Sequence, residues 1–380
     1  MATPQFHSLN VREVCAETAD AISVVFEVPG ALREAYRFRE GQFLTLKADV
    51  DGEELRRSYS ICVPVQHYER TGELRVGIKR VADGRFSNWA NDSLKPGLQI
   101  EVMSPDGRFH GRQEPGRARH VVGFAGGSGI TPMVSLIGTL LEAEPQCRFS
   151  LVYGNRTVSS IMFLEQLEGL RNRYLGRLRL LHVLSDEPQE IELLSGLLDQ
   201  PRCASLLATV LSDAPIDEAF ICGPAPMMDA AEAALLAFGV ARERIRIERF
   251  GTPPGSVSGS GTGIASGPGH SKRHREDQAG DVAGGVAPAR IVIVVDGKER
   301  HLELAHEGVS LLDAGLAAGA PLPYACKGGV CCTCRCKVLE GEVRMDRNFT
   351  LEPQEIEAGF VLSCQAHPVT DRVVVSFDER

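Results

Sequence analysis

The chain has 380 residues, of which 43% are hydrophobic and 24% are charged, so its composition is that of a folded globular protein and excludes a largely disordered one. At roughly 100–200 residues per domain, this length predicts two to four domains. With 50 acidic and 41 basic side chains, the formal charge of −9 argues against nucleic acid or an anionic membrane surface as the main partner.

Membrane and secretory signals are not evident in the sequence. No apolar run approaches the roughly 18 residues that a membrane span needs, and residues 1–12 lack the apolar stretch of a secretory signal. There are eleven cysteines, and six of them lie between Cys326 and Cys364. Because thiols stay unpaired in a reducing cytosol, this local group indicates a metal site rather than disulfides. The lack of an apolar span and of a secretory signal leads us to expect a cytoplasmic protein.

Residues 1–112 are predicted to form a first domain of short strands separated by turn residues. This pattern is typical of an antiparallel barrel or sandwich. The expected strands cover residues 8–15, 22–28, 42–48, 57–63, 74–81 and 99–104, and a helix is expected near residues 87–94.

A tetrapeptide in this domain, Arg57-Ser58-Tyr59-Ser60, opens a predicted strand and suits a flavin. Arg57 offers a rigid fork for a phosphate, and Tyr59 offers a flat face for the isoalloxazine ring. Ser60 offers a small hydrogen-bonding group near the reactive edge of the ring. The alternative is a barrel strand with an ordinary cross-strand tyrosine.

A second phosphate-suited feature is Gly84-Arg85-Phe86-Ser87, which opens a short predicted helix. A helix N-terminus is a ready anion site, and two such features in one domain favour a flavin. The predicted flavin-binding residues are Arg57, Ser58, Tyr59, Ser60, Val76, Gly77, Gly84, Arg85, Phe86 and Ser87.

Residues 113–250 change to a rhythm of strand, turn and helix, which predicts a parallel sheet with ligands at the carboxyl ends of its strands. The strands are expected at residues 120–125, 149–153, 178–184, 219–222 and 244–248. Helices are expected to start near Pro132, Ser160, Leu193 and Pro226.

The first turn of this domain carries the pattern G-x-G-x-x-P at Gly127, Gly129 and Pro132, with the proline at an expected first helical position. Glycines let the backbone approach a pyrophosphate, and the helix N-terminus favours its charge. This pattern predicts a nicotinamide dinucleotide bound by Gly126, Gly127, Ser128, Gly129, Ile130 and Thr131.

Two further turns lie at the same predicted edge of the sheet. Cys222-Gly223-Pro224 ends a strand where it could face the nicotinamide, although Cys222 could equally be a small residue at a tight turn. Arg156 follows another strand and could meet a 2′-phosphate, although a lone loop arginine is more often only solvated.

Residues 251–287 are predicted to be a flexible linker, because they contain ten glycines and five serines but no aromatic residue. After it, residues 288–380 carry cysteines at C-x4-C-x2-C, followed by a distant fourth. This is the spacing of a plant-type [2Fe-2S] site, whereas zinc, the main alternative, usually takes two close C-x2-C pairs. The predicted ligands are Cys326, Cys331, Cys334 and Cys364, with Cys332 and Cys336 as non-ligands.

In this order, the motifs resemble the ferredoxin–NADP⁺ reductase superfamily with a fused C-terminal plant-type ferredoxin domain. Within that superfamily they are most similar to the reductase subunits of ring 1,2-phenylacetyl-CoA epoxidases. The resemblance covers nearly the whole chain apart from the linker. It is carried by Arg57-Ser-Tyr-Ser, Gly84-Arg-Phe-Ser-Asn-Trp, Tyr153-Gly-Asn-Arg-Thr, Cys222-Gly-Pro, Tyr324-Ala-Cys-Lys-Gly-Gly-Val-Cys, Asn348-Phe-Thr-Leu-Glu-Pro and Gly359-Phe-Val-Leu-Ser-Cys-Gln-Ala.

The resemblance implies three domains: an antiparallel β-barrel that binds FAD, an α/β parallel-sheet domain that binds NAD(P)H, and a β-grasp (α+β) ferredoxin domain. It implies an electron-transfer reductase whose partner is a diiron oxygenase, with Tyr59, Ser60 and Cys222 nearest the hydride-transfer chemistry. Two other functions stay open: a reductase of this design for another oxygenase, such as a steroid hydroxylase or a desaturase, and a redox-sensing flavo-iron–sulfur protein.

The choice between NADPH and NADH also stays open. Where the superfamily often has a serine–arginine pair for the 2′-phosphate, this chain has Ser185-Asp186. The carboxylate of Asp186 would repel a phosphate or bind a ribose hydroxyl, which favours NADH. Arg156 and the resemblance favour NADPH.

Overall fold

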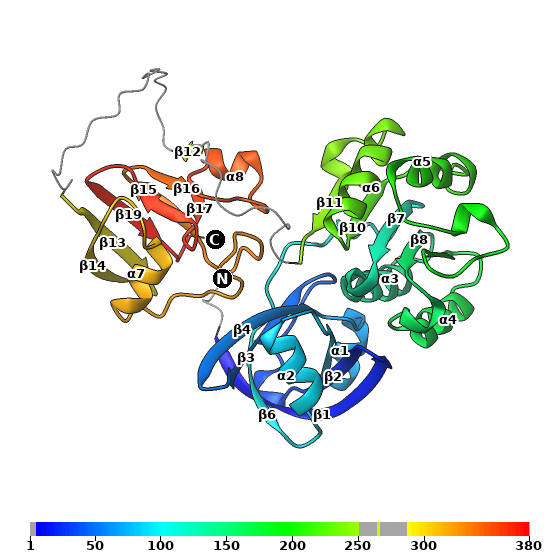
Figure 1. Cartoon of the computed structure of the whole chain (residues 1–380), viewed down its shortest axis with the longest axis horizontal. Helices are drawn as coiled ribbons and strands as arrows, with labels where there is room; N and C mark the ends of the chain where they lie inside the picture. Colours follow the sequence, from blue (N-terminus) through cyan, green and yellow to red (C-terminus); the bar gives the residue numbers. More distant parts are fainter. Residues whose placement is uncertain (1–4, 251–263, 267–286, 380) are drawn as a thin grey trace. The chain divides into compact units, whose positions relative to one another are not determined.

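The computed structural model describes residues 5–250, 264–266 and 287–379, which fall into two compact units on either side of residue 250 (Figure 1). Most of the predicted linker, residues 251–263 and 267–286, lies outside the described residues. Within it, Ile264–Ser266 form strand β12. None of the helices described is long and apolar enough to cross a membrane.

The first half of the larger unit is an antiparallel sheet of six strands in the order β4-β3-β6-β1-β2-β5. The strands are β1 (Phe6–Thr18), β2 (Ala21–Glu27), β3 (Phe43–Val50), β4 (Glu53–Ser60), β5 (Glu73–Lys79) and β6 (Gln99–Met103). Helix α2 (Arg85–Ser93) agrees with the expected helix, whereas α1 (Val65–Thr71) was not predicted. Leu44 and Leu46 of β3 are among the apolar side chains that fill this barrel.

The two edge strands of this sheet meet at one end. Ile61, directly after β4, forms an antiparallel bridge with Val76 of β5. The backbone N–H of Cys62 donates to the carbonyl of Arg75 at 2.9 Å. This closure brings Ser60, at the end of β4, close to Val76 and Gly77, which are far from it in the sequence.

The second half of the larger unit is a parallel sheet in the order β11-β10-β7-β8-β9. Its strands are β7 (His120–Gly126), β8 (Arg148–Asn155), β9 (Leu178–Leu184), β10 (Glu218–Cys222) and β11 (Ile245–Glu248). Every residue of β7 and β10 is buried, as expected for central strands covered on both faces. The helices of this domain form two pairs, which Figure 1 shows apart from each other: α3 (Ile130–Ala143) with α4 (Leu164–Arg173), and α5 (Gln200–Thr209) with α6 (Ala225–Ala237). Each pair of helices covers an apolar core of its own.

Three predicted helix starts in this sheet domain were misplaced, one of them because α4 begins at Leu164 rather than near Ser160. Helix α3 begins at Ile130 after a 3-10 turn over Gly127–Gly129, so Pro132 is its third residue rather than its first. Helix α5 begins at Gln200, where the Asp199 carboxylate accepts from the N–H of Arg202 at 2.9 Å. Proline is tolerated in a first turn because the N–H groups there have no partner within the helix.

The barrel and the parallel-sheet domain pack against each other through helices α1 and α3. The N–H of Val65 donates to the Thr139 hydroxyl at 3.0 Å, and Arg70 pairs with Glu142 at 2.8 Å. Phe109, in the segment that leaves the barrel, stacks edge-on against Phe220 of β10 at 5.3 Å between ring centroids. These contacts make the two domains one compact unit.

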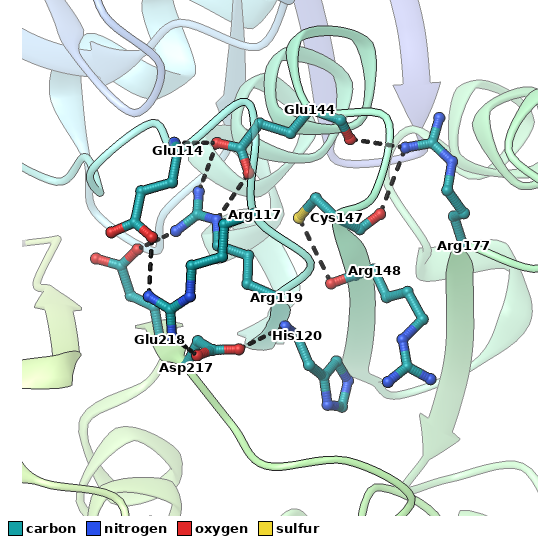
Figure 2. Close-up of polar contacts among 10 residues, drawn as sticks. All are labelled: Glu114, Arg117, Arg119, His120, Glu144, Cys147, Arg148, Arg177, Asp217 and Glu218. Carbon is teal, nitrogen blue, oxygen red and sulfur yellow. Dashed lines mark hydrogen bonds and ion pairs between the residues drawn. The ribbon is translucent and has the colours of Figure 1, made fainter.

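A buried ion-pair network secures the segment that leads from the barrel into the parallel sheet (Figure 2). The guanidinium of Arg119, whose side chain is 3% exposed, donates to the Glu144 carboxylate at 2.7 and 2.8 Å and to Glu218 at 3.1 Å. Glu144 also accepts from the N–H of Glu114 at 3.0 Å. Removing one partner would leave a buried charge unpaired, at a cost of about 3–5 kcal/mol.

The C-terminal unit has a five-stranded sheet in the order β14-β13-β19-β15-β17 and a three-stranded sheet in the order β12-β16-β18. Its elements are β13 (Ala289–Val295), β14 (Lys298–Leu304), α7 (Leu311–Ala317), β15 (Arg335–Glu340), β16 (Val343–Met345), α8 (Pro353–Glu357), β17 (Phe360–Leu362), β18 (Ala366–Pro368) and β19 (Arg372–Ser376). The β13–β14 hairpin turns at Asp296 and Gly297, which have φ of 48° and 69°, as the Asp-Gly signal predicts. Strands β13 and β19 pair in parallel, so the two ends of this domain lie side by side in its sheet.

Candidate functional site

The predicted flavin tetrapeptide lies at the end of β4, with Ser58 opposite Thr45 of β3. Arg57 is exposed, and Tyr59 is half-buried with its ring 5.9 Å from that of Phe86. Burial raises the pKa of the Tyr59 hydroxyl, so this side chain remains neutral. Ser60 is 2% exposed, and its hydroxyl finds no hydrogen-bond partner among the described residues.

That unpartnered Ser60 hydroxyl fits a flavin. A buried polar atom without a partner is unfavourable unless a ligand or water completes its bonding. Arg57 and Tyr59 share one face of β4 and present an exposed cation and an aromatic ring, and Ser60 ends the strand with a small polar group. These residues could hold the phosphate, the ring system and the ring edge of one elongated cofactor.

The start of α2 lies close by, but its polar groups are already engaged. The Ser87 hydroxyl accepts from the N–H of Val81 and donates to the carbonyl of Gly84, both at 3.2 Å. Arg85 forms a close ion pair with Glu53 and donates to the Val50 carbonyl at 3.0 Å. The local role of both side chains is therefore to hold the helix start against the barrel.

The glycine-rich turn after β7 requires its glycines. Gly127 has φ of 52°, in the left-handed region, and its carbonyl accepts from the Tyr153 hydroxyl at 2.9 Å. A Cβ atom at Gly129 would lie 2.0 Å from the carbonyl oxygen of Cys222. The Thr131 hydroxyl donates to the Ser128 carbonyl at 3.0 Å. The turn is thus held from both neighbouring strands.

The Cys222 turn meets this glycine turn directly. A Cβ atom at Gly126 would lie 2.7 Å from the Pro224 ring, and one at Gly223 would lie 2.9 Å from the N of Gly126. The structure therefore brings together two predicted groups of nucleotide-binding residues that are nearly one hundred positions apart. Both lie at the carboxyl ends of neighbouring parallel strands, where open α/β sheets bind ligands.

Sequence reasoning missed Glu248, the last residue of β11, which lies opposite Cys222 in the parallel register. Burial raises the pKa of the Glu248 carboxyl to about 8. Burial also raises the pKa of the Cys222 thiol, and the negative field of Glu248 adds to that shift. The sequence does place a carboxyl at the end of a predicted strand. That this carboxyl faces Cys222 can be recognised only when the register of the two strands is known.

Arg156 and Asp186 lie together at the same edge of the sheet, after β8 and β9. The N–H of Asp186 donates to the carbonyl of Arg156 at 2.9 Å, and the Ser185 hydroxyl donates to the Asp186 carboxylate at 2.6 Å. Glu187 accepts from the N–H of Val158 at 2.9 Å, which adds a second carboxylate to this loop. An exposed cation and two carboxylates therefore share this part of the edge.

The predicted cluster cysteines gather in the C-terminal unit as two pairs of thiols. The pKa of Cys326 is lowered because the Cys331 thiol donates to its sulfur and backbone N–H groups, such as that of Gly328 at 3.3 Å, point at it. The pKa of Cys364 is lowered in the same way by the Cys334 thiol and then by the side-chain amide of Gln365. The two pairs also lie within electrostatic reach of each other.

This pairing fits a dinuclear cluster. Across the described residues, no group of three or more His, Cys, Asp or Glu side chains gathers as one metal ion requires. A [2Fe-2S] cluster takes four thiolates over two irons, so it accommodates ligands arranged in two pairs. Lys327 and Gly329, with φ of 50° and 78°, curve the loop so that its amides face the sulfurs.

The two remaining cysteines of the region have other surroundings. Cys332 contacts the Thr350 hydroxyl at 3.2 Å, and Cys336 is fully buried in the core on β15. Burial raises the pKa of the Cys336 thiol. Cys332 and Cys336 remain predicted non-ligands, since neither belongs to the two thiol pairs.

Three family models match the chain in the same order as these sites. They are an oxidoreductase FAD-binding domain over residues 8–110, an oxidoreductase NAD-binding domain over residues 124–233 and a 2Fe-2S iron-sulfur cluster binding domain over residues 293–369. The predicted cofactor types, FAD, a nicotinamide dinucleotide and a [2Fe-2S] cluster, are confirmed. The predicted three-domain architecture is confirmed as well.

The chain is 46% identical over 375 residues to a subunit of the 1,2-phenylacetyl-CoA epoxidase from Escherichia coli (strain K12), covering 99% of this chain and 98% of that one. The chain belongs to this family of oxygenase reductases. A more distant member of this reductase family, the ferredoxin reductase component of 3-ketosteroid-9-alpha-monooxygenase from Rhodococcus rhodochrous, is 34% identical over 371 residues, covering 97% and 96% of the two chains. Members of the family are reductase components that pass electrons to an oxygenase component, and this chain is such a component.

Two solved structures share the fold of this chain. Phthalate dioxygenase reductase matches with a TM-score of 0.56 at 20% identity, and the match covers 98% of both chains. An intact type IV self-sufficient cytochrome P450 monooxygenase matches with a TM-score of 0.65 at 17% identity, covering 97% of this chain and 41% of that one. These likenesses concern the fold alone.

Proposed function

We propose that this reductase delivers electrons from NAD(P)H to a diiron oxygenase that epoxidises the aromatic ring of phenylacetyl-CoA. The observation that carries the proposal is the 46% identity to a component of such an epoxidase along nearly the full length of both chains. The identity to the ketosteroid monooxygenase reductase, 34%, makes a steroid hydroxylase the second candidate partner. A protein that only senses redox state would have no need of this whole set of domains.

Within this function, the residues of the larger unit bind and orient two cofactors. When bound, FAD supplies hydride acceptance and single-electron release, and a [2Fe-2S] cluster supplies one-electron transfer. We assign Arg57 to the flavin phosphate, Tyr59 to a ring face and Ser60 to the ring edge. Because the Ser60 hydroxyl has no partner among the described residues, it is available for that bond.

The nucleotide is assigned to the two turns that meet at the sheet edge. Backbone N–H groups at Gly127–Thr131 would hold the pyrophosphate, since they open α3 and carry the positive end of its dipole. Cys222 and Glu248, adjacent across β10 and β11, would border the nicotinamide. Their raised pKa values keep both groups protonated and uncharged near neutral pH, so neither would place a negative charge beside the bound coenzyme.

In the C-terminal unit, Cys326, Cys331, Cys334 and Cys364 are assigned as cluster ligands. Within each pair the shared hydrogen bond lowers the pKa of one thiol, Cys326 or Cys364, which favours the thiolate form that binds iron. The same bond raises the pKa of its partner, Cys331 or Cys334. We also infer a reducing, cytoplasmic environment, which is supported by the lack of a disulfide among the cysteines of the described residues.

Reconstitution tests the partner. The purified reductase is mixed with the diiron epoxidase component and phenylacetyl-CoA, and in parallel with a ketosteroid hydroxylase and its steroid. We expect NAD(P)H consumption to be coupled to product only with the epoxidase. Coupled steroid hydroxylation without epoxidation would establish the second candidate, and a failure to reduce even an artificial one-electron acceptor such as cytochrome c would contradict both.

A further inference from the structure

We propose that Phe163 is a positioning residue for hydride transfer. It sets how closely the first turn of α3, which follows the glycine-rich turn, approaches strand β5 of the barrel. The proposal rests on the hydride path inferred above and adds a residue that none of the site motifs contains. Phe163 lies at the start of α4, outside both the glycine turn and the flavin tetrapeptide.

The backbone of Phe163 is held in an unusual conformation by the barrel. Its φ of 58° and ψ of 27° lie in the left-handed region, which bulky side chains rarely adopt. Its N–H donates to the carboxylate of Glu17, on β1 of the barrel, at 3.1 Å. Strained backbone persists where the surrounding structure imposes it, and such positions cluster at functional sites.

The ring of Phe163 lies at the point where three elements meet. A Cβ atom built on Gly77 of β5 would be 3.1 Å from the Cε2 and Cζ atoms of this ring and 2.8 Å from the methyl group of Thr131. Gly77 was predicted to bind the flavin and Thr131 to bind the nucleotide. The Phe163 ring therefore packs beside Thr131 against β5, at the place where the barrel and the first turn of α3 approach each other.

The surroundings of the ring make this spacing rigid. Phe163 is 3% exposed and belongs to an apolar core that also contains Ala21 and Cys62 of the barrel. Such cores are close-packed, so a lost ring is replaced by movement of its neighbours or by a void. Hydride transfer needs reacting atoms about 3–3.5 Å apart, and a displacement of about 1 Å can slow a reaction about 100-fold.

A phenylalanine that only fills the core would affect stability when it is replaced, but it would not specifically affect the rate of flavin reduction. Matched variants separate this role from a positioning role. Phe163→Gly and Phe163→Ala both remove the ring, but glycine adopts the left-handed conformation without strain. Phe163→Leu restores most of the volume. Leu167→Ala, one turn later in α4 and equally buried, is the control for simple loss of core packing.

The measurement is anaerobic stopped-flow reduction of the bound flavin by NADPH and by NADH in the full-length holoprotein. We expect Phe163→Ala and Phe163→Gly to lower the limiting reduction rate about 100-fold, with the coenzyme Kd changed less than about 3-fold. A larger primary isotope effect with 4-deuterated coenzyme should accompany the slower step. Phe163→Leu should recover most of the rate, and Leu167→Ala should keep it while losing comparable thermal stability.

Other results would overturn the proposal. These are an unchanged limiting rate in Phe163→Ala, a loss confined to Kd, or an equal loss in Leu167→Ala. A normal rate in Phe163→Gly alone would assign the effect to the backbone and not to the ring. If the ring variants do not fold, Glu17→Ala and Glu17→Gln decide: Glu17→Ala should slow reduction and Glu17→Gln, which keeps an acceptor, should not. A complete lack of flavin reduction in the unmodified holoprotein would instead refute the proposed function.

Discussion

The region assigned to the flavin and the nucleotide and the loop that carries the cluster cysteines are built in different ways. The four thiols assigned to the cluster come from a nine-residue loop and one further position, and they contact one another in two pairs. The flavin and nucleotide residues come from β4, β5, β7, β10 and the helices that follow, and they meet because a barrel and a parallel sheet pack together.

This difference shows how each region should fail. A cluster held by covalent ligands depends on individual atoms, so one substitution removes it while the other domains keep their structure. A site assembled by packing depends on spacing, so it is sensitive to added or removed volume at residues that touch no cofactor. The following predictions test this contrast in order of decreasing effect.

The largest effect is expected from Cys331→Ser. Replacing a predicted ligand should abolish cytochrome c reduction and remove iron and sulfide, while NAD(P)H still reduces the flavin. Cys332→Ser, one position away, is the matched control and should keep both activities. Visible absorbance, iron analysis and stopped-flow reduction provide the measurements. A Cys331→Ser protein with full cytochrome c reduction would show that electrons do not leave through this site.

The packed site should be broken by one methyl group at Gly129. Because its Cβ would lie 2.0 Å from the Cys222 carbonyl oxygen, Gly129→Ala must move backbone. We expect flavin reduction to fall about 100-fold and unfolding stability to fall by about 1–3 kcal/mol.

Gly169→Ala is the control, because its Cβ meets nothing within 4 Å in α4. It should leave flavin reduction unchanged and stabilise the fold by about 0.5–1 kcal/mol. Stopped-flow reduction and urea titration measure both variants. Equal behaviour of the two alanines would mean that the close approach of the two turns does not matter.

A smaller effect, on the choice between NADPH and NADH, is expected from the charged residues Arg156 and Asp186 at the edge of the sheet. Asp186→Arg replaces a carboxylate beside Arg156 with a second cation, so the ratio of kcat/KM for NADPH over NADH should rise about 10-fold, equivalent to about 1.4 kcal/mol. Asp186→Asn removes the negative charge that would repel the 2′-phosphate of NADPH without adding a positive charge that would attract it, so this variant separates the two contributions. Steady-state kinetics with both coenzymes provide the readout, and an unchanged ratio would place residue 186 outside the site.

The smallest effect is expected from Glu248→Gln and depends on pH. The pKa of Glu248 is about 8 in the fold and near its ordinary 4.5 in the unfolded chain. The unfolded chain therefore loses this proton first, so the carboxyl destabilises the fold increasingly from pH 4.5 to 8.

Glu248→Gln should accordingly raise Tm more at pH 8 than at pH 5, by about 2–4 °C for each 1 kcal/mol of destabilisation that it relieves. Glu243→Gln, at an exposed carboxyl nearby, should show no such trend. Thermal unfolding at the two pH values measures both, and an equal gain at pH 5 would contradict the shifted pKa.

Local patterns predicted much of this molecule. The Asp296-Gly297 hairpin, the order of strands and helices along the chain and the glycine turn after β7 all follow from nearby residues. The start of α5 was misplaced, because Leu193 suits a helix but the capping carboxylate is Asp199. The α1 helix was missed because it is short, and its packing on α3 supports it.

What the sequence alone determined is the set of cofactors, because cysteine spacing and glycine turns act over a few residues of chain. The tertiary structure decided which distant groups meet: Glu248 beside Cys222, Gly129 against the Cys222 turn, and Phe163 at Gly77. Those contacts depend on strand register and on the packing of two domains, and neither is encoded in the spacing of neighbouring residues.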